Sequence, residues 1–450
     1  MKRKLSSEKT RLFLYFFFIA LLGSILLSLP QAYKNGIPVN YIDALFTSVS
    51  AICVTGLSTL SMDVFSRTGL IFILILIEAG GLGILTYISF LMTVSSKKIS
   101  VVNGNLIKDF YIDDIDFNPK SILKKIVLFT LLIQVVGSIL LIPGLYKAGD
   151  QHFIFNSIFL SISAFCNAGF SPSSDSLSGF SGNWYVLSII MGLIILGGIG
   201  FVVFTNIAQK IRFARKGQIF YLSLHVKIVL ISTVVLIVSG FVFTFISFYK
   251  TSLWELPLSK RILTALFESV TLRTAGFETI PQTSFTSSAS LFHLVLMFIG
   301  GSPGSIAGGV KTTTAFITLL YLLDGNEQRT TVSFANRRIP STIINKSITI
   351  VSRSVLILLI SAISLSYAEN HLISNGTISL IDIIYESVSA LATVGLSRGL
   401  TPQLSILGKL IIIITMYIGR TGIYAMSIKS GFTGSDNEDL IYPEESLLVG

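Results

Sequence analysis

The sequence contains little charge for its length. Only 12 % of its 450 residues are Asp, Glu, Lys or Arg, which is about half the share found in a soluble domain. Hydrophobic residues make up 52 %, and the mean hydropathy is +0.78. A soluble fold of this size could not remove so much apolar surface from water. The composition therefore excludes a soluble enzyme and a disordered protein, and it indicates a multi-pass membrane protein.

Cysteine and histidine are also scarce. Cys53 and Cys166 both lie in apolar sequence, so neither a disulfide framework nor a cysteine-rich metal site is predicted. The four histidines lack metal-ligand spacing, and no nucleophile is paired with a base. We therefore expect no enzymatic activity and no covalent cofactor. The net charge of +10 comes from basic clusters beside apolar runs, which is typical of membrane proteins rather than of nucleic-acid binding.

Eight apolar runs are long enough to cross a bilayer. They lie near residues 12–29, 69–95, 123–146, 184–207, 223–249, 288–323, 347–367 and 405–428, and the sixth is interrupted. Between the two members of each pair lies a half-apolar segment that is too short to cross. These segments lie near 42–53, 153–166, 261–273 and 379–392. The pattern predicts an all-α membrane protein in which the order long, short, long occurs four times.

The basic residues predict the orientation of the chain. An even number of spans places both termini on one side. With the N-terminus inside, 22 of the 33 Lys and Arg residues lie on the inner side and 8 lie outside. Because inner loops carry an excess of Lys and Arg, we expect both termini to be cytoplasmic.

Four segments of the chain resemble one another, and each ends in a glycine followed by Leu or Phe. They are SVSAICVTGLS (48–58), SISAFCNAGFS (161–171), SVTLRTAGFET (269–279) and SVSALATVGLS (387–397). Their glycines, Gly56, Gly169, Gly276 and Gly395, lie 113, 107 and 119 residues apart. This spacing predicts one structural unit repeated four times. We place the units at 1–96, 97–212, 213–324 and 325–430, with a cytoplasmic tail at 431–450.

A second glycine cluster follows each of these glycines. It begins 24 residues later at Gly80, Gly300 and Gly419, and 28 residues later at Gly197. Taken alone, these clusters could be small residues that let helices pack closely. Their regular distance from the loop glycines supports the fourfold repeat.

A half-spanning helix followed by irregular backbone must be buried in protein or line a wet cavity, because lipid offers no hydrogen-bond partners. Four such loops can meet on one axis, with their helix C-termini directing partial negative charge at it. Carbonyl oxygens can then replace the hydration shell of a potassium-sized ion, and glycine allows the φ > 0 backbone that this requires. We predict a cation filter formed by Val54, Thr55, Gly56, Asn167, Ala168, Gly169, Thr274, Ala275, Gly276, Thr393, Val394 and Gly395.

With these motifs the chain resembles the Trk/Ktr/HKT superfamily of potassium transporters, and most of all the Ktr-type membrane subunit, from residue 12 to about 430. Thr393-Val394-Gly395 also matches the start of the Thr-Val-Gly-Tyr-Gly potassium filter, whereas the other copies keep only the glycine. The resemblance implies four helix–pore-loop–helix units around one central pore, and potassium uptake across the plasma membrane. It also implies that Gly56 favours K⁺, since serine at this place goes with sodium permeation in the superfamily.

The resemblance further implies partners. These are a second copy of the chain in a homodimer, and a cytosolic ring of RCK-type nucleotide-binding regulatory subunits. The basic loops 208–217 and 329–346 are candidate docking surfaces for that ring, and anionic lipid is the alternative partner. K⁺ would be the transported ion, and Na⁺ is a candidate coupling or activating ion.

The sixth span is interrupted by five glycines and a proline within 299–314, which cannot continue a regular helix. A nucleotide P-loop is disfavoured, since Val310 stands where the lysine should be. We expect an intramembrane loop beneath the filter, and the resemblance implies that this loop is a gate that moves aside for conduction. A static kink is the alternative. The candidate gate residues are Gly300, Gly301, Ser302, Gly304, Ser305, Gly308, Gly309, Lys311 and Arg420.

Arg420 replaces the glycine that the other copies have at Gly81, Gly198 and Gly301. A charge at that depth is costly and usually functional or paired. Arg420 would oppose cations in the inner cavity, or hold the loop closed by donating hydrogen bonds to its carbonyls. The resemblance supports this role, and a structural ion pair is the alternative. Lys311 is expected either within the loop or snorkelling to the cytoplasm.

Two further polar residues lie beside the loop glycines. Arg273 stands three residues before Gly276, and we expect it to brace the third loop from behind with Glu268 or Glu386. Asn167 is expected to bond to a neighbouring loop.

Three other functions compete with potassium uptake. A sodium-selective or sodium-coupled transporter of the same fold is the nearest. A membrane-embedded enzyme would need paired carboxylates or histidines, and Glu78 has no evident partner of that kind. A packing scaffold without transport predicts that alanine would be tolerated at the four loop glycines.

Overall fold

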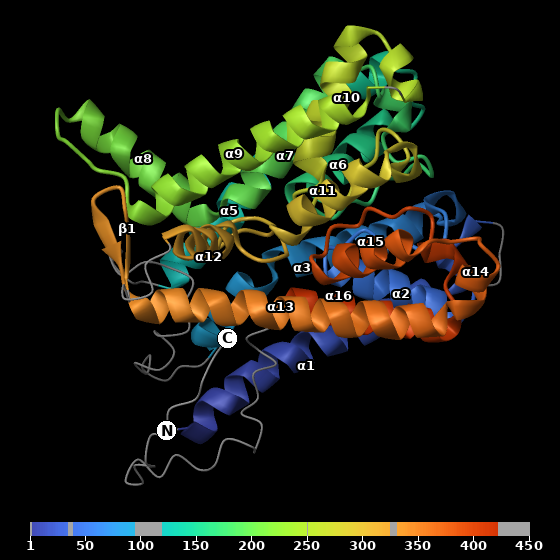
Figure 1. The fold of residues 1–450 in the computed structure, drawn as a ribbon, viewed down its shortest axis with the longest axis horizontal. Helices are drawn as coiled ribbons and strands as arrows, with labels where there is room; N and C mark the ends of the chain where they lie inside the picture. Colours follow the sequence, from blue (N-terminus) through green and yellow to red (C-terminus); the bar gives the residue numbers. More distant parts are fainter. Residues whose placement is uncertain (1, 35–38, 95–118, 250, 325–330, 422–450) are drawn as a thin grey trace.

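The computed structural model describes residues 2–34, 39–94, 119–249, 251–324 and 331–421. The tail expected at 431–450, Gly422 and the basic stretch 97–118 lie outside these ranges. The described chain is helical apart from one small hairpin. Figure 1 shows α13 (Ser341–Ala368) along one edge of the molecule and α9 (Leu224–Ser247) along the opposite edge.

The helices of the predicted spans flank four interior helices. Besides α9 and α13, they are α1 (Lys2–Leu27), α3 (Arg67–Val94), α5 (Pro119–Lys147), α7 (Trp184–Ile199), α8 (Phe201–Arg215), α11 (Ser287–Phe298), α12 (Thr312–Asp324) and α16 (Ile406–Thr421). The short helices that lie between them are α2 (Tyr41–Ile52), α6 (Phe153–Phe165), α10 (Leu258–Thr271) and α15 (Leu380–Leu391). The connections add short 3-10 turns at 30–32, 62–64, 178–180, 252–255, 282–284 and 401–403, and α14 (Asn370–Ser374).

Helices lie in the described part of each of the eight apolar runs, and the sixth run contains two helices separated by residues 299–311. Within the described chain, Lys124–Lys147 of α5, the whole of α9 and the whole of α13 are each long and apolar enough to cross a membrane. The fourth run was predicted to be one continuous helix over 184–207, and this prediction is wrong. The chain bends by 95° between α7 and α8, at Gly200. That residue has φ 91° and ψ 146°, a conformation that glycine adopts far more readily than any other residue.

The all-α prediction needs one correction. Strands β1 (Val332–Phe334) and β2 (Arg337–Ile339) form an antiparallel hairpin in the loop after α12. Its two-residue turn, Ala335-Asn336, has positive φ at both positions (49° and 60°), which matches the twist of a tight hairpin. The sequence did not predict this hairpin, because each strand has only three residues.

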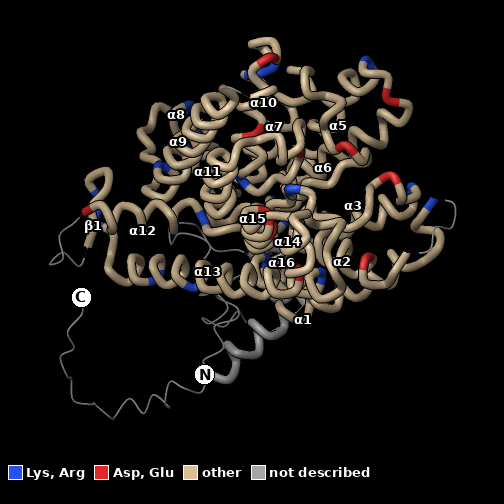
Figure 2. The backbone as a smooth tube through the Cα atoms, turned by 45° about the vertical axis from the view of Figure 1, so that its right-hand side comes forward, with Lys and Arg blue, Asp and Glu red and all other residues tan. Residues whose placement is uncertain are grey.

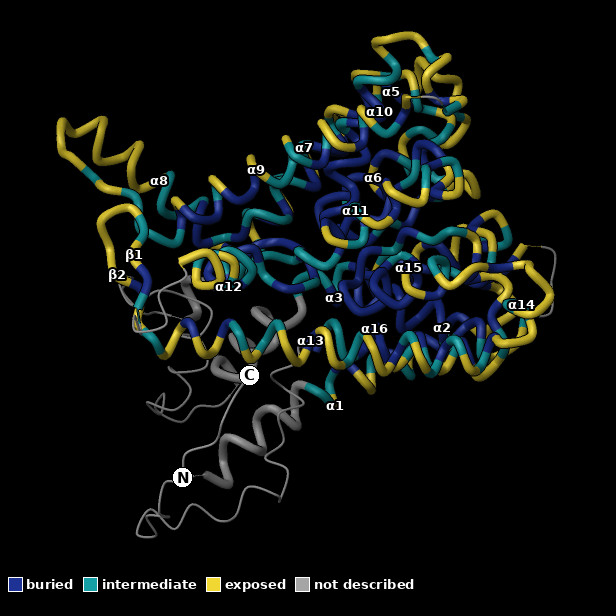
Figure 3. Tube along the Cα trace, viewed as in Figure 1, coloured by how far each residue is buried: buried dark blue, intermediate teal, exposed yellow. Residues whose placement is uncertain are grey.

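The four short helices form the interior of the protein, and Figure 3 shows them mostly as buried backbone. Serines allow three of them to pack close to the preceding long helix. The Ser48 hydroxyl donates to the carbonyl of Ala20, Ser161 to Gln134, and Ser269 to Ile237, at 2.6–2.7 Å. In each case a glycine three residues after the acceptor leaves room for the hydroxyl, at positions 23, 137 and 240. The same local chemistry therefore sets the same helix pairing in three parts of the chain.

Candidate functional site

A loop with the same backbone conformation follows each short helix. Gly56, Gly169, Gly276 and Gly395 have φ between 72° and 97°. The residue two positions earlier also has positive φ, between 50° and 66°, and these residues are Val54, Asn167, Thr274 and Thr393. Positive φ is uncommon for a β-branched residue. Four equal departures at four equivalent positions indicate a shared functional constraint on the loops.

The four loops touch one another in a closed ring. A methyl group added at Gly56 would lie 2.5 Å from the carbonyl oxygen of Ala168 in the second loop. At Gly169 it would lie 2.9 Å from the oxygen of Ala275 in the third loop. The third loop in turn contacts the fourth, since a methyl group at Gly276 would overlap the carbonyl oxygen of Val394.

The fourth loop closes the ring on the first. A methyl group added at Gly395 would overlap the carbonyl oxygen of Thr55 and lie 3.0 Å from the Cα of Gly56. Residues more than 330 positions apart in the chain are thus in contact. Glycine is required at all four positions for two reasons, namely the positive φ and the lack of space for a Cβ atom.

Hydroxyl groups on the short helices brace the loops, and these residues were not singled out from the sequence. The Ser50 hydroxyl accepts a hydrogen bond from the Gly56 amide at 3.1 Å, and Ser389 accepts one from the Gly395 amide at 3.1 Å. Ser163 and Thr271 instead donate to loop carbonyls, at 2.7 and 2.8 Å, the acceptors being Phe170 and Phe277. The signal was present in the repeats, because each carries Ser or Thr at this position.

The helical glycines that follow each loop fit against the short helices. A methyl group at Gly80 would overlap the carbonyl oxygen of Ile52, the last residue of α2. In the same way, a methyl group at Gly197 or Gly419 would overlap the carbonyl oxygen of Phe165 or Leu391, the last residues of α6 and α15. These glycines therefore let helices pack closely, which is the role that the sequence analysis considered for the glycine clusters taken alone.

The sixth predicted span is interrupted between Phe298 of α11 and Thr312 of α12. The intervening residues 299–311 are called the intramembrane loop below. Its two ends are held together by backbone hydrogen bonds. The Gly300 amide donates to Val310 at 3.0 Å, and the Val310 amide donates to Phe298 at 3.0 Å. The loop is thus an ordered structure with a closed base.

Glycines on both sides of the contact let the intramembrane loop lie close to its neighbours. A methyl group at Gly81 of α3 would lie 3.5 Å from the side chain of Ile306. One at Gly301 would lie 2.9 Å from the carbonyl oxygen of Gly198. One at Gly308 would overlap the hydroxyl of Thr393 in the fourth loop. The intramembrane loop therefore lies directly against the ring.

The bend at Gly200 and the intramembrane loop satisfy each other's backbone groups. Because α7 ends there, its last carbonyls have no helical partner. The Ser302 amide donates to the carbonyl of Gly198 at 3.0 Å, and the Ser302 hydroxyl donates to that of Ile199. The first amide of α8, on Phe201, donates to Gly304 at 3.2 Å. The intramembrane loop thus supplies the hydrogen-bond partners that a continuous helix would have supplied at the bend.

Arg420 lies against the intramembrane loop. Its guanidinium donates to the carbonyl oxygen of Ile306 at 2.6 Å and to that of Gly80 in α3. The Lys311 ammonium donates to Ala307 at 2.5 Å, so Lys311 lies within the loop and does not snorkel away from it. Two cations therefore stand at one short segment of buried backbone.

Two expectations for side chains beside the ring are wrong. Arg273 donates to the carbonyl oxygen of Gly300 at 3.4 Å, and the Glu268 oxygens have no hydrogen-bond partner among the described residues. Glu386 accepts from Ser397 and Thr401 instead. The Asn167 amide, oriented to satisfy its neighbours, donates to Ala164 and Ile194 at 3.0 and 3.2 Å rather than to another loop. Arg273 thus connects the third loop to the intramembrane loop.

Polar links also join the units at the end of the molecule where α15 begins. Arg398, three residues after a loop glycine, pairs with Asp382 at 2.6 Å and donates to the hydroxyl of Ser290 at 2.8 Å. In another link, Lys409 of α16 pairs with Asp43 of α2 at 2.6 Å. No pattern in one sequence predicts the contacts of Arg398 with Ser290 and of Lys409 with Asp43, because these partners lie over 100 residues apart.

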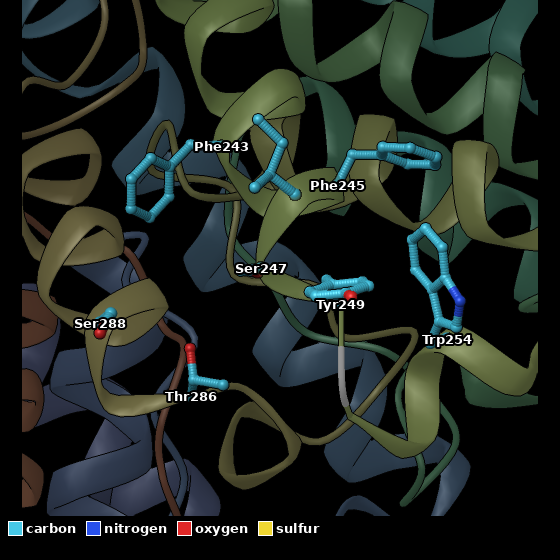
Figure 4. Close-up of a pocket in the computed structure, with 8 residues that line it drawn as sticks. Phe243, Phe245, Ser247, Tyr249, Trp254, Thr286 and Ser288 are labelled. Carbon is cyan, nitrogen blue, oxygen red and sulfur yellow. The ribbon is translucent and has the colours of Figure 1, made fainter.

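Nothing in the described chain suggests catalysis. The carboxylate of Glu78 accepts from the amide of Gln134 at 2.9 Å and lies 3.5 Å from the Cys166 thiol, so it is not paired with a second acid or a histidine. No group of three or more potential metal ligands occurs in the same ranges. Figure 4 shows a surface pocket of about 570 Å³ at the end of α9, and none of the ring or loop residues lines it.

Comparison with known proteins identifies the family to which the chain belongs. The crystal structure of the potassium transporter TrkH from Vibrio parahaemolyticus matches with a TM-score of 0.71 at 18 % identity, over 93 % of this chain and 84 % of that one. The TrkH family, described as cation transport protein, matches residues 16–433. The chain belongs to the TrkH cation transport family. It is therefore a multi-pass membrane protein of a family of ion transporters, and not an enzyme.

Curated relatives of the TrkH family match almost the whole chain. The potassium/sodium uptake protein NtpJ of Enterococcus hirae is 34 % identical over 442 residues, which cover 97 % of this chain and 95 % of NtpJ. The Ktr system potassium uptake protein B of Bacillus subtilis is 32 % identical over 439 residues, with the same coverage. The family resemblance inferred from the sequence is confirmed.

Proposed function

We propose that this protein takes up potassium across the cell membrane, and that a partly dehydrated ion passes through the ring of four loops. The observation that carries the proposal is the closed contact of Gly56, Gly169, Gly276 and Gly395 at the ends of four buried helices. Helix C-termini stabilise a cation near that ring, and loop carbonyls can replace its water. The names of the two curated relatives support potassium as the ion.

Four pseudo-symmetric units around one pore account best for this geometry. We assign them to residues 1–96, 97–212, 213–324 and 325–430. Each contributes two longer helical segments, one short helix and one loop to the ring. Both termini would be cytoplasmic, as the distribution of Lys and Arg indicates.

The intramembrane loop is the proposed gate. It lies against the fourth loop of the ring through Gly308, and so stands on the path of an ion that has passed the ring. Arg420 opposes cations there by its charge and holds the loop by its hydrogen bond to Ile306. Conduction would require these contacts to break.

Regulation would come from other chains. We propose a homodimer that sits on a cytosolic ring of RCK-type nucleotide-binding subunits. The word "system" in the name of the Bacillus subtilis relative supports a multi-component assembly. K⁺ is the transported ion, and Na⁺ is the candidate coupling or activating ion.

The test is ion uptake into potassium-depleted cells that lack their own uptake systems, comparing the wild type with Gly56→Ser. A serine side chain would collide with Ala168 and strain the backbone. We expect the preference for K⁺ over Na⁺ to fall by about tenfold, which corresponds to about 1.4 kcal/mol.

The matched control is Gly376→Ser. Gly376 also has positive φ, 70°, but a side chain there would have no neighbour within 4 Å. Unchanged selectivity in both variants would refute the ring as the filter. Uptake of Na⁺ alone by the wild type would instead favour the sodium-selective alternative, which the name of NtpJ keeps open.

A further inference from the structure

Helix α8 leaves the helix bundle in a direction that the spans do not share. It continues α7 after the 95° bend at Gly200, so it runs roughly along the membrane plane if α7 crosses it. Figure 1 shows α8 projecting from the rest of the molecule, beside the start of α9. A helix in this position lies at the membrane surface.

The surface of α8 combines positive charge with exposed apolar side chains. Its C-terminal part and the residue after it carry four cations, which have no carboxylate partner in the described chain, and Figure 2 shows basic residues on this helix. They are Lys210, Arg212, Arg215 and Lys216. Ile211 is 50 % exposed, and Ile219 and Tyr221 in the following segment are 80 % and 77 % exposed. This composition is typical of helices that lie in the interface of an anionic bilayer.

The chain returns to the membrane soon after α8. Eight residues separate Arg215 from Leu224, the first residue of α9, and they can span about 29 Å at most. Because α8 is itself about 22 Å long, this segment is long enough to run back along it. Ring stacking between Phe213 and Phe220, with centroids 5.4 Å apart, fixes this reversal. Both ends of α8 are therefore tied to spans, which keeps its cations near lipid headgroups.

We propose that α8 binds anionic phospholipid headgroups and thereby sets how firmly the intramembrane loop is held. This inference rests on the proposed gating role of that loop. Charge complementarity and the exposed apolar residues favour lipid over a protein surface, since each cation near an anionic surface contributes about a fivefold preference.

The coupling between lipid and loop is carried by the residues on either side of Gly200. The Phe201 amide of α8 donates to Gly304, and Ser302 donates to the last carbonyls of α7. These bonds exist only while the chain is bent. Anionic lipid that holds α8 along the membrane plane therefore favours the loop in its present place. Ion flux should be lower in anionic bilayers than in neutral ones.

Lipid binding can be measured without transport. In a chain with Trp184 and Trp254 replaced by Phe, Tyr221→Trp places the single indole at the exposed apolar surface. Its quenching by brominated phosphatidylglycerol is compared with that by brominated phosphatidylcholine in vesicles containing the full chain. We expect severalfold stronger quenching by the anionic lipid. Neutralising Lys210, Arg212, Arg215 and Lys216 with glutamine should bring the ratio to about 1. The control, glutamine at Lys34, Lys147 and Lys260 near the other end of the molecule, should keep it.

The coupling is tested by K⁺ flux in the same vesicles. Phe201→Pro removes the amide that donates to Gly304, and proline is tolerated at the first position of a helix. Its control, Phe201→Ala, removes the ring but keeps the amide. We expect flux in neutral vesicles to exceed that in anionic vesicles for wild type and Phe201→Ala, and the two fluxes to be equal for Phe201→Pro.

Each result bears on a separate claim. An indole that neither brominated lipid quenches would overturn lipid binding and point to a protein at α8. Stronger quenching by the anionic lipid, combined with equal K⁺ flux in anionic and neutral vesicles, would overturn the coupling. Absence of K⁺ flux under all conditions, with quenching intact, would count against the proposed function and leave lipid binding established.

Discussion

At the scale of single residues, the site depends on groups that the surrounding fold forces into unusual positions. The four loop glycines could be chosen from the sequence because they recur and because only glycine accepts that backbone. The positive φ of Val54 could not be predicted, since β-branched residues avoid it and only contacts between loops stabilise it. The partner of Arg273 was missed because the sequence predicts the intramembrane loop but not which of its carbonyl groups lies against the third loop.

The proposed gate gives Arg420 two roles, a charge barrier and a hydrogen-bonded hold on the loop, which substitution can separate. Arg420→Ala removes both its charge and its hydrogen bonds to Ile306 and Gly80. Because a hydrogen bond from a charged group contributes about 1.5–3 kcal/mol, we expect K⁺ flux to rise at least about tenfold in reconstituted vesicles.

The control is Arg420→Lys, which keeps the charge but not the planar fork. Flux near that of the wild type in Arg420→Lys would show that charge is the main barrier. Flux near that of Arg420→Ala would assign the effect to the hydrogen bonds. Unchanged flux in both variants would remove Arg420 from the gate.

At the scale of secondary-structure elements, the sequence located the helices but not how they end. All eight apolar runs form helices, because burial in lipid selects for continuous apolar sequence. The bend at Gly200 was not predicted, since Gly197, Gly198 and Gly200 look like the glycine clusters of the other copies. What distinguishes it is the intramembrane loop, which arrives from more than 100 residues away to satisfy the freed carbonyls. The hairpin at 332–339 was missed because its strands have three residues each.

The contact between α7 and the intramembrane loop can be weakened one hydroxyl at a time. Ser302 bonds to α7, whereas the Ser305 hydroxyl donates only to Ser302 within the loop, at 2.6 Å. Ser302→Ala should therefore favour displacement of the loop by about 1 kcal/mol, which is about fivefold in K⁺ flux. Ser305→Ala is the matched control and should have a smaller effect. Equal fluxes in the two variants would contradict a gate that is held at α7.

At the scale of the whole molecule, the first and last parts of the chain must meet for the ring to close. The repeat pattern predicted that four loops would gather, but it could not show what joins the fourth to the first. The structure adds the ion pair between Asp43 and Lys409. The Thr59 hydroxyl also donates to the Asp43 carboxylate, at 2.7 Å. The contact of Gly395 with Thr55 depends on this closure.

Breaking that ion pair should loosen the whole protein. Asp43→Asn removes the carboxylate that Lys409 pairs with, and Lys409→Met leaves Asp43 with only the Thr59 hydroxyl, so each change should cost about 1.5–3 kcal/mol. We expect each single variant to lower the apparent melting temperature in detergent, measured by size-exclusion chromatography after heating. In the double variant the losses should be less than additive. Additive losses would show that the two residues act independently.

A ring built from four unequal loops of one chain, with a single obstructing segment beneath it, differs from a channel of four identical subunits. Only the third unit supplies the intramembrane loop, and only the fourth supplies Arg420. In the proposed gate, movement of this one segment would clear the path, so no concerted change among four equal parts would be needed. Conduction through each molecule should then switch between two levels, without the graded intermediate currents that four independent subunit gates could produce.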